Sequence, residues 1–270
     1  MKLSEILKRM FVERVCLICT EAVSYDKNPP ICPDCEEDWQ AFLSIKCREC
    51  GREYNECTCL PSKIRKICHS MASWCYFYDV EKNGNVGKIF YNLKYNYDRA
   101  TINFCANMMK RSLDILFRKR DQCYNDYVVT YIPRRYKNVK KYGFDQSQKL
   151  AKALARLLKI NCICTLDNVG NAEQKHLNKK ERAYNAQMSF KYIEGSLKDY
   201  KKVILVDDIM TSGATLFTCA LQLYKNGATA VVPATFAKDN YVIKGGRRNV
   251  KRSTKYNFAG AVKGFVRNGS

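Results

Sequence analysis

Apolar positions follow two different periods along the chain, and beyond residue 70 these periods predict alternating strands and helices. Continuous aliphatic and aromatic runs predict strands at 71–80 (a strand or one arm of a hairpin), 127–132, 202–206 and 229–235. Apolar residues at helical spacing predict helices at 86–95, 101–117, 146–158 and 213–225, the last one ending at Asn226-Gly227. Strands that alternate with helices predict an α/β fold in which helices flank a mostly parallel sheet.

The segment 203–215 joins one of these predicted strands to a chemically distinctive loop. Four branched aliphatic residues are followed by Asp207 and Asp208, and then by the small residues Thr211, Ser212, Gly213, Ala214 and Thr215. In an open α/β sheet, ligands bind at the carboxyl ends of the strands, and free N–H groups at the start of a helix bind phosphate. Adjacent carboxylates beside such a loop indicate a ligand that carries hydroxyls and a phosphate on one sugar. A simpler interpretation, an N-cap and a surface acid, fits the flanking pattern less well.

Fifteen cysteines indicate metal sites or free thiols rather than disulfides. Two CxxC pairs, Cys16/Cys19 and Cys32/Cys35, have spacing typical of a structural zinc site. A second set comprises Cys47, Cys50, Cys57 and Cys59, in which Cys68 or His69 could replace one ligand. Four thiolates leave no open coordination position, so a catalytic metal is not indicated. The remaining cysteines lie among apolar residues and are predicted to be small buried side chains: Cys75, Cys105, Cys123, Cys162, Cys164 and Cys219.

The net charge of +21 is concentrated after residue 60 and indicates a polyanionic partner, either nucleic acid or a phosphorylated ligand. Nine Lys or Arg residues oppose one acid both in 133–159 and in 238–270. A solvated basic surface is the alternative for the bulk charge. In 238–270, aromatic residues interleave with the basic ones, as suits single-stranded nucleic acid, and a disordered basic tail without function is the alternative there. The N-terminal segment lacks a signal-peptide pattern and no apolar stretch is long enough to span a membrane, so we expect a cytoplasmic protein without membrane insertion.

In order and spacing, several motifs resemble those of the ComF family of competence proteins. They are the N-terminal cysteine modules, Leu93-Lys94-Tyr95, Ile132-Pro133, Gly143-Phe144-Asp145-Gln146, Gln174 with Leu177, Glu181-Arg182 with Asn185, Phe190 and the Val206–Thr215 signature. The resemblance implies a double zinc ribbon over 1–62, a type I phosphoribosyltransferase-like domain over 63–237 and a basic tail over 238–270 that we expect to be flexible. It also implies single-stranded DNA as a partner during natural transformation, together with a DNA-uptake helicase.

The same resemblance assigns roles within a site for phosphoribosyl pyrophosphate (PRPP) and Mg²⁺. Asp207 and Asp208 would hold the ribose hydroxyls, and residues 211–215 would wrap the 5-phosphate. Arg134 and Arg135 would lie near the pyrophosphate, while Gly143, Phe144 and Gln146 would form a lid. Gln174 and Arg182 are candidate catalytic residues. Three functions remain open: a DNA-handling protein that binds Mg-PRPP, an active phosphoribosyltransferase with a nitrogenous acceptor, and a PRPP-sensing regulator.

Overall fold

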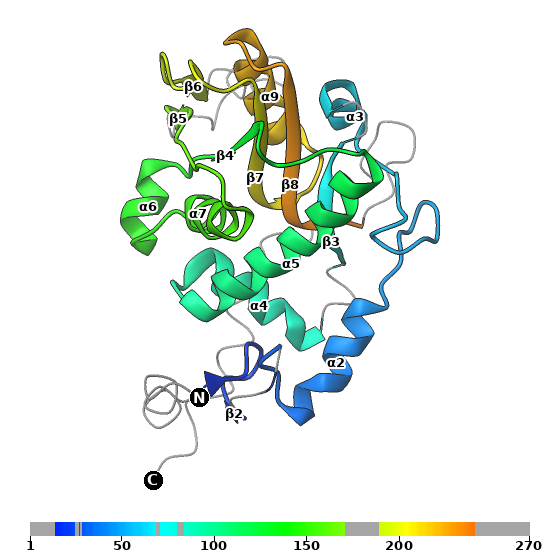
Figure 1. The fold of residues 1–270 in the computed structure, drawn as a ribbon. Helices are drawn as coiled ribbons and strands as arrows, with labels where there is room; N and C mark the ends of the chain where they lie inside the picture. Colours follow the sequence, from blue (N-terminus) through cyan, green and yellow to red (C-terminus); the bar gives the residue numbers. More distant parts are fainter. Residues whose placement is uncertain are drawn as a thin grey trace, which may run out of the picture. The chain divides into compact units, whose positions relative to one another are not determined.

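The computed structural model describes residues 14–24, 27, 29–68, 71–79, 84–170 and 189–240. Within these ranges the fold is mixed α/β with a parallel central sheet (Figure 1). The sheet order is β3-β8-β7-β4, formed by β3 (Ser73–Tyr78), β8 (Ala230–Asp239), β7 (Lys202–Met210) and β4 (Tyr127–Tyr131). Every pairing in this sheet is parallel, so all four carboxyl ends lie at one edge.

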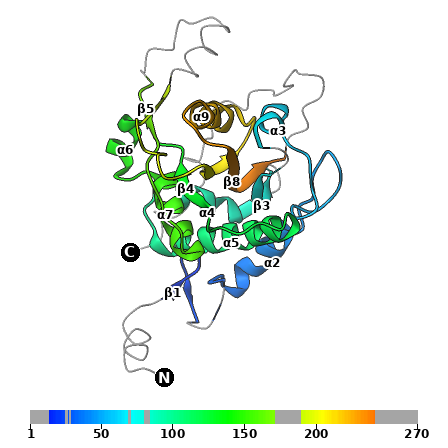
Figure 2. The ribbon, with the colours of Figure 1, turned by 45° about the horizontal axis from the view of Figure 1, so that its top comes forward.

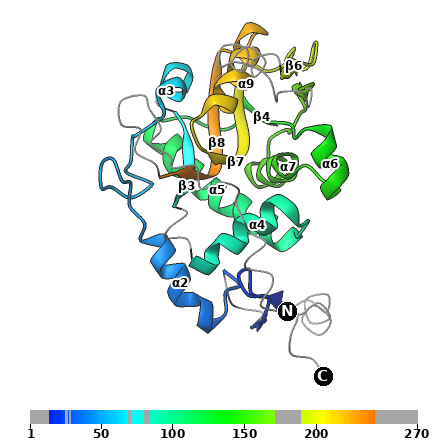
Figure 3. The ribbon, with the colours of Figure 1, turned by 180° about the vertical axis from the view of Figure 1, so that it is seen from behind.

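Helices cover both faces of the sheet (Figures 1 and 2). The helices α5 (Arg99–Lys119) and α7 (Gln146–Leu158) pack together on one face, α5 against β3 and β8 and α7 against β4 and β7. The helices α3 (Ser62–Cys68) and α9 (Ala214–Lys225) pack against each other and against β8 on the other face, as the reverse view also shows (Figure 3). The aliphatic residues 203–206 of β7 are completely buried between these layers, which explains their continuous apolar pattern.

Local sequence fixes where the helices near the carboxyl edge begin and end. The Asp98 side chain accepts hydrogen bonds from the backbone N–H groups of Ala100 and Thr101, at 3.0 and 2.8 Å, and so caps α5. Asp145 caps α7 in the same way, by accepting a 3.1 Å hydrogen bond from the Gln148 N–H. Gly143 adopts a left-handed conformation and ends the short helix α6 (Tyr136–Tyr142).

Smaller elements surround this core. The helix α4 (Gly87–Tyr95) follows the 3₁₀ turn η1 (Gly84–Val86) and contacts α5. The antiparallel pair β5 (Leu166–Asn168) and β6 (Phe190–Tyr192) lies after α7. The pair β1 (Arg14–Val15) and β2 (Ala22–Val23) precedes α2 (Pro33–Leu43). None of the described helices is both long and apolar enough to cross a membrane.

The predicted alternation of strands and helices is confirmed, with shifted boundaries. The strand β7 continues to Met210, beyond the predicted end at Val206, so Asp207 and Asp208 lie inside the strand, and Asp207 pairs in register with Thr235. β8 likewise continues through Lys238 and Asp239, which the composition groups with the basic tail. The expectation that all six remaining cysteines are buried is wrong for Cys123 and Cys164, which are exposed on connecting segments, and for Cys162, which is half-buried.

Candidate functional site

The carboxyl end of β7 places two acids on the two sides of the strand, because successive side chains of a strand point in opposite directions. Asp207 Oδ1 accepts hydrogen bonds from Ser147 Oγ of α7 at 3.1 Å and from the Asp208 N–H at 3.0 Å. Burial and the neighbouring Asp208 carboxylate raise the pKa of Asp207 well above its ordinary value, although Lys94 opposes this shift. A cation beside Asp207 would relieve the cost of its ionisation.

The loop after β7 leads directly into α9. Gly213 is the N-cap residue and has a φ of +69°. Ala214 and Thr215 therefore belong to the first turn of α9, where backbone N–H groups have no intrahelical partner. Such a turn can donate several hydrogen bonds to an anion.

A cavity of about 250 Å³ opens beside this turn. Arg135, at the start of α6, lines it together with Ala214 and Thr215. Further lining residues, for which the sequence gives no PRPP role, are Asn168, Ser189, Phe190 and Thr218. The Asn168 side chain donates a 2.9 Å hydrogen bond to the Pro133 carbonyl, which ties β5 to the end of β4. Three predicted site residues, Arg135, Ala214 and Thr215, thus line one cavity. Residues of β5 and β6 line it as well, which the sequence does not predict.

Arg134 is directed elsewhere. Its guanidinium carbon lies 4.4 Å from the centroid of the Tyr142 ring, and its Nη1 is 3.4 Å from the Phe144 carbonyl oxygen. Its backbone N–H donates a 2.7 Å hydrogen bond to Asp145 Oδ2. In this conformation Arg134 holds the turn between α6 and α7, whereas Arg135 alone of the pair lines the cavity.

The predicted lid residues lie at that turn, Gly143 at its left-handed corner and Phe144 and Gln146 buried. Phe144 contacts the ring of Tyr97 at a centroid distance of 5.7 Å. Gln174 and Arg182, the candidate catalytic residues, lie outside the described residues, as does the tail beyond Asn240.

Gly213 is required by the protein itself, in addition to any ligand. A Cβ atom at this position would lie 2.4 Å from Cγ1 and 2.9 Å from Cδ1 of Ile64, which is fully buried in α3. The observed close neighbour of Gly213 is thus a side chain of the segment that follows the second cysteine group.

The eight cysteines of the N-terminal module form two groups of four, in each of which all Sγ atoms lie within 4.8 Å of one another. The first group is Cys16, Cys19, Cys32 and Cys35, and the second is Cys47, Cys50, Cys57 and Cys59. Cys68 instead belongs to α3, and His69 lies outside the described residues. Both groups could bind a zinc ion, because four converging thiolates form its preferred tetrahedral set. Burial and the Cys50 thiol beside it raise the pKa of Cys59 to about 11, so a cation is needed to hold all four sulfurs as thiolates.

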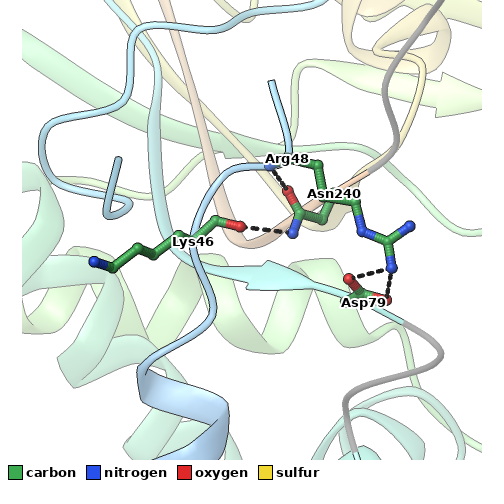
Figure 4. A network of polar contacts seen from close by, with 4 residues as sticks. All are labelled: Lys46, Arg48, Asp79 and Asn240. Atoms are coloured by element: carbon green, nitrogen blue, oxygen red, sulfur yellow. Dashed lines mark hydrogen bonds and ion pairs between the residues drawn. The ribbon is translucent and has the colours of Figure 1, made fainter. Parts of the chain in front are cut away.

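Asn240, the residue that follows β8, contacts Lys46 and Arg48, the two neighbours of Cys47 in the chain (Figure 4). The Asn240 side chain accepts a hydrogen bond from the Arg48 N–H and donates one to the Lys46 carbonyl, each at 2.9 Å, and so brackets Cys47. The Arg48 guanidinium pairs with Asp79 at 2.7 Å, just after β3. Two strand ends of the sheet therefore fix the backbone that carries the first ligand of this group.

Lys238 places a positive charge beside the same group. It is 7% exposed, and its Nζ lies 5.1 Å from the ring centroid of Trp74 and 5.4 Å from that of Phe77. Within the described ranges, no carboxylate forms an ion pair with it, and its charge acts on the Cys57 thiol. A buried charge is costly unless it is compensated. Four thiolates around Zn²⁺ carry a net charge of −2, which supplies that compensation.

Lys238→Met is therefore expected to lower the zinc affinity of the second group by about tenfold or more, as loss of an outer-shell partner does at other metal sites. Competition with a chromophoric chelator would measure this change. Lys202→Met is a suitable control, because Lys202 pairs with Asp126 at the surface and should leave both zinc affinities unchanged. Equal affinities in Lys238→Met and the wild type would contradict the assignment.

Comparison with known proteins finds no matching family model and no matching curated protein. Among solved structures, the chain is similar to an allosteric regulatory enzyme of purine biosynthesis, with 17% identity and a TM-score of 0.34 over 53% of this chain and 29% of that one. It is also similar to a hypoxanthine phosphoribosyltransferase from Staphylococcus aureus, with 13% identity and a TM-score of 0.32 over 53% of this chain and 68% of that one. A hypothetical protein from Neisseria gonorrhoeae with bound ppGpp matches with 13% identity and a TM-score of 0.32, over 55% and 76% of the two chains.

The chain thus spans less than a third of the length of the first of these proteins.

Proposed function

We propose that this chain binds PRPP together with Mg²⁺ at the carboxyl ends of β4 and β7. The cavity that joins Arg135 to the first turn of α9 is the observation that carries this proposal. It combines the first-turn N–H groups of α9, of which that of Ala214 lies 3.4 Å from Ser212 Oγ, with the Thr215 hydroxyl and a guanidinium, all of which favour a phosphate group. Asp207 and Asp208 lie in β7, which residues 211–213 connect to that turn, and there they can hold sugar hydroxyls directly or through Mg²⁺.

Calorimetric titration of the purified chain with Mg-PRPP tests the proposal directly. We expect saturable binding that requires Mg²⁺, and Arg135→Ala is expected to weaken it about tenfold or more through loss of a charge-assisted hydrogen bond. Arg118→Ala is a control, since Arg118 lies at the end of α5 and its Nε donates to the Asp114 carbonyl. Absence of binding by the wild-type chain would refute the proposal.

Pyrophosphate release separates a binding protein from a phosphoribosyltransferase. Transfer would break the bond from C1 to the pyrophosphate oxygen and form a bond from C1 to an acceptor nitrogen. Mg²⁺ would neutralise the leaving pyrophosphate when bound, while the cavity residues would orient PRPP. Pyrophosphate release that depends on an added nitrogenous base or amine would assign the enzyme function; its absence with a panel of such acceptors would favour PRPP as a ligand of a DNA-handling or regulatory protein.

A second feature favours the DNA-handling role implied by the ComF resemblance. A groove of about 460 Å³ lies between the start of α5 and α7, and it is lined by four cations: Arg99, Lys149, Lys152 and Arg156. No acidic residue of the described chain lines it. The exposed ring of Tyr97 lies at this groove, with Lys149 Nζ 4.9 Å from its centroid. A basic groove with an exposed aromatic ring suits single-stranded nucleic acid, which offers phosphates and unstacked bases together.

Lys149→Ala/Lys152→Ala/Arg156→Ala is expected to reduce the salt dependence of single-stranded DNA binding. Loss of three phosphate contacts lowers the slope of log K against log salt by about 2 for a single strand. Fluorescence anisotropy with a labelled oligothymidylate at several salt concentrations measures this slope. Lys201→Ala/Lys202→Ala/Lys225→Ala removes the same charge at the start of β7 and the end of α9 and is the matched control. Equal slopes for the two triple variants would remove the groove from the DNA-binding surface.

A further inference from the structure

A short stretch of chain leads from the second cysteine group into α3, and α3 packs against residues 211–217, which we call the phosphate loop. Cys57 and Cys59 are the last two ligands of that group, and Leu60-Pro61 leads from them directly into α3. The Cys59 N–H lies 3.4 Å from Cys57 Sγ, and Leu60 and Pro61 are both buried. The Arg65 N–H donates a 3.0 Å hydrogen bond to the Pro61 carbonyl, which fixes the first turn of α3 to this stretch.

The helix α3 lies along α9 over its whole length. At its start, Ile64 and Pro61 pack against Gly213, the N-cap of α9. Lys63 Nζ lies 5.7 Å from the centroid of the Phe217 ring. At its end, the Tyr224 hydroxyl donates a 2.5 Å hydrogen bond to the Ile67 carbonyl. The helix that follows the metal ligands is thus the support against which the phosphate-binding turn rests.

The closest contact between α3 and the phosphate loop is that of Ile64 with Gly213. The separation from Ile64 is too small for a Cβ atom, so a change in the position of Ile64 must be accommodated by the N-cap itself. The N-cap sets the direction of the first N–H groups of α9, which are the proposed phosphate donors.

We propose that a metal ion in the Cys47/Cys50/Cys57/Cys59 group controls the affinity of the phosphate loop for its ligand through Leu60-Pro61 and α3. This inference rests on the proposed PRPP site and adds a regulation of it. With the metal bound, Cys57 and Cys59 fix the start of α3; without it, this stretch loses its anchor and Ile64 no longer holds Gly213. The coupling is reciprocal, so a ligand in the loop strengthens metal binding by the same factor.

The first cysteine group provides a contrast within the same chain. Its ligands lie beside β1 and β2 and at the start of α2, and α2 contacts the turn η1. Cys35 is followed by the rest of α2 rather than by a segment that reaches α9. Loss of this metal should therefore leave the phosphate loop unchanged.

Cys50→Ser and Cys19→Ser form a matched pair for the test, because each removes one thiolate from one group. Each full-length variant is expected to lose one of two zinc ions, measured by elemental analysis. Calorimetry with Mg-PRPP should then show at least about fivefold weaker binding for Cys50→Ser and less than about a twofold change for Cys19→Ser, within the range of typical coupling between sites. Ile64→Ala should keep both zinc ions and still weaken Mg-PRPP binding.

In the wild type, saturating Mg-PRPP should slow zinc extraction from the second group by a chelator.

Hydrogen exchange at residues 211–217 separates failure of the coupling from failure of the PRPP site. If Cys50→Ser, but not Cys19→Ser, speeds exchange in this loop, the metal controls the loop whether or not PRPP is its ligand. If calorimetry shows that the wild-type protein binds no Mg-PRPP, the proposed function is refuted, independently of the exchange result. Unchanged loop exchange and unchanged Mg-PRPP affinity in both Cys50→Ser and Ile64→Ala would overturn the coupling.

Discussion

Asp207→Asn/Asp208→Asn is expected to raise the dissociation constant for Mg-PRPP by about 100-fold or more. Hydrogen bonds to charged groups contribute about 1.5–3 kcal/mol each, and two such losses exceed the roughly 2.8 kcal/mol that corresponds to a factor of about 100 at about 1.4 kcal/mol per factor of ten. Calorimetry with wild-type protein and the variant measures the difference. Binding within about threefold of the wild type would show that the acids at the end of β7 do not hold the ligand.

The fold of this variant should remain intact, which makes the loss of binding interpretable. Asparagine keeps an oxygen that can accept hydrogen bonds from Ser147 and from the backbone N–H of position 208. The pKa of Asp207 is raised by burial and by Asp208, so its ionised form destabilises the native state as the pH rises above the pKa of an unfolded aspartate. A neutral asparagine at position 207 carries no such cost, and the free energy of unfolding at neutral pH should be unchanged or higher.

The same pKa shift predicts how binding depends on pH. Mg²⁺ prefers an ionised carboxylate, whereas burial and the Asp208 carboxylate raise the pKa of Asp207 in the ligand-free protein. The affinity for Mg-PRPP should therefore increase with pH through the raised pKa of Asp207, and binding below that pKa should release a proton. Calorimetry in buffers of different ionisation enthalpy detects this proton. No proton release at any pH would mean that the protonation of Asp207 does not change on binding, so that it does not hold the Mg²⁺.

The parts of the fold that the sequence predicts well carry strong local signals. The helix over 146–158 matches α7 at both ends, because Asp145 caps it and its apolar positions repeat at the helical period. Strands β4 and β7 are recognised by short runs rich in aliphatic and aromatic residues, which are buried between two helical layers. The two cysteine groups follow directly from their spacing.

The parts that it misses depend on contacts between distant segments. The helix α3 has seven residues and β5 and β6 have three each, too few for a periodic pattern. Their positions are fixed by packing on α9 and by the hydrogen bond from Asn168 to the Pro133 carbonyl. Lys238 would be assigned to the basic tail from composition, yet it lies in β8 and is buried against Trp74 of β3. A contact between residues so far apart in the chain cannot be predicted from one sequence.

Gly213→Ala is expected to lower both the affinity for Mg-PRPP and the free energy of unfolding by a large amount. The positive φ costs a residue with a Cβ atom about 1–2 kcal/mol, and overpacking against a buried side chain adds about 1–3 kcal/mol. The overlap with Ile64 can be relieved only by displacing α3 or the N-cap turn. The free energy of unfolding should therefore fall by about 2–5 kcal/mol, and Mg-PRPP affinity should fall with it, as urea unfolding and calorimetry would measure.

Gly195→Ala separates the two causes, because Gly195 has a similar φ of +73° but no heavy atom within 4 Å of an added Cβ. It should lose only the backbone contribution of about 1–2 kcal/mol and bind Mg-PRPP normally. Ile64→Ala combined with Gly213→Ala should recover part of the stability lost in Gly213→Ala, since the shortened side chain removes the overlap. If Gly213→Ala and Gly195→Ala are equally destabilised, backbone conformation alone explains Gly213, and α3 exerts no constraint on the phosphate loop.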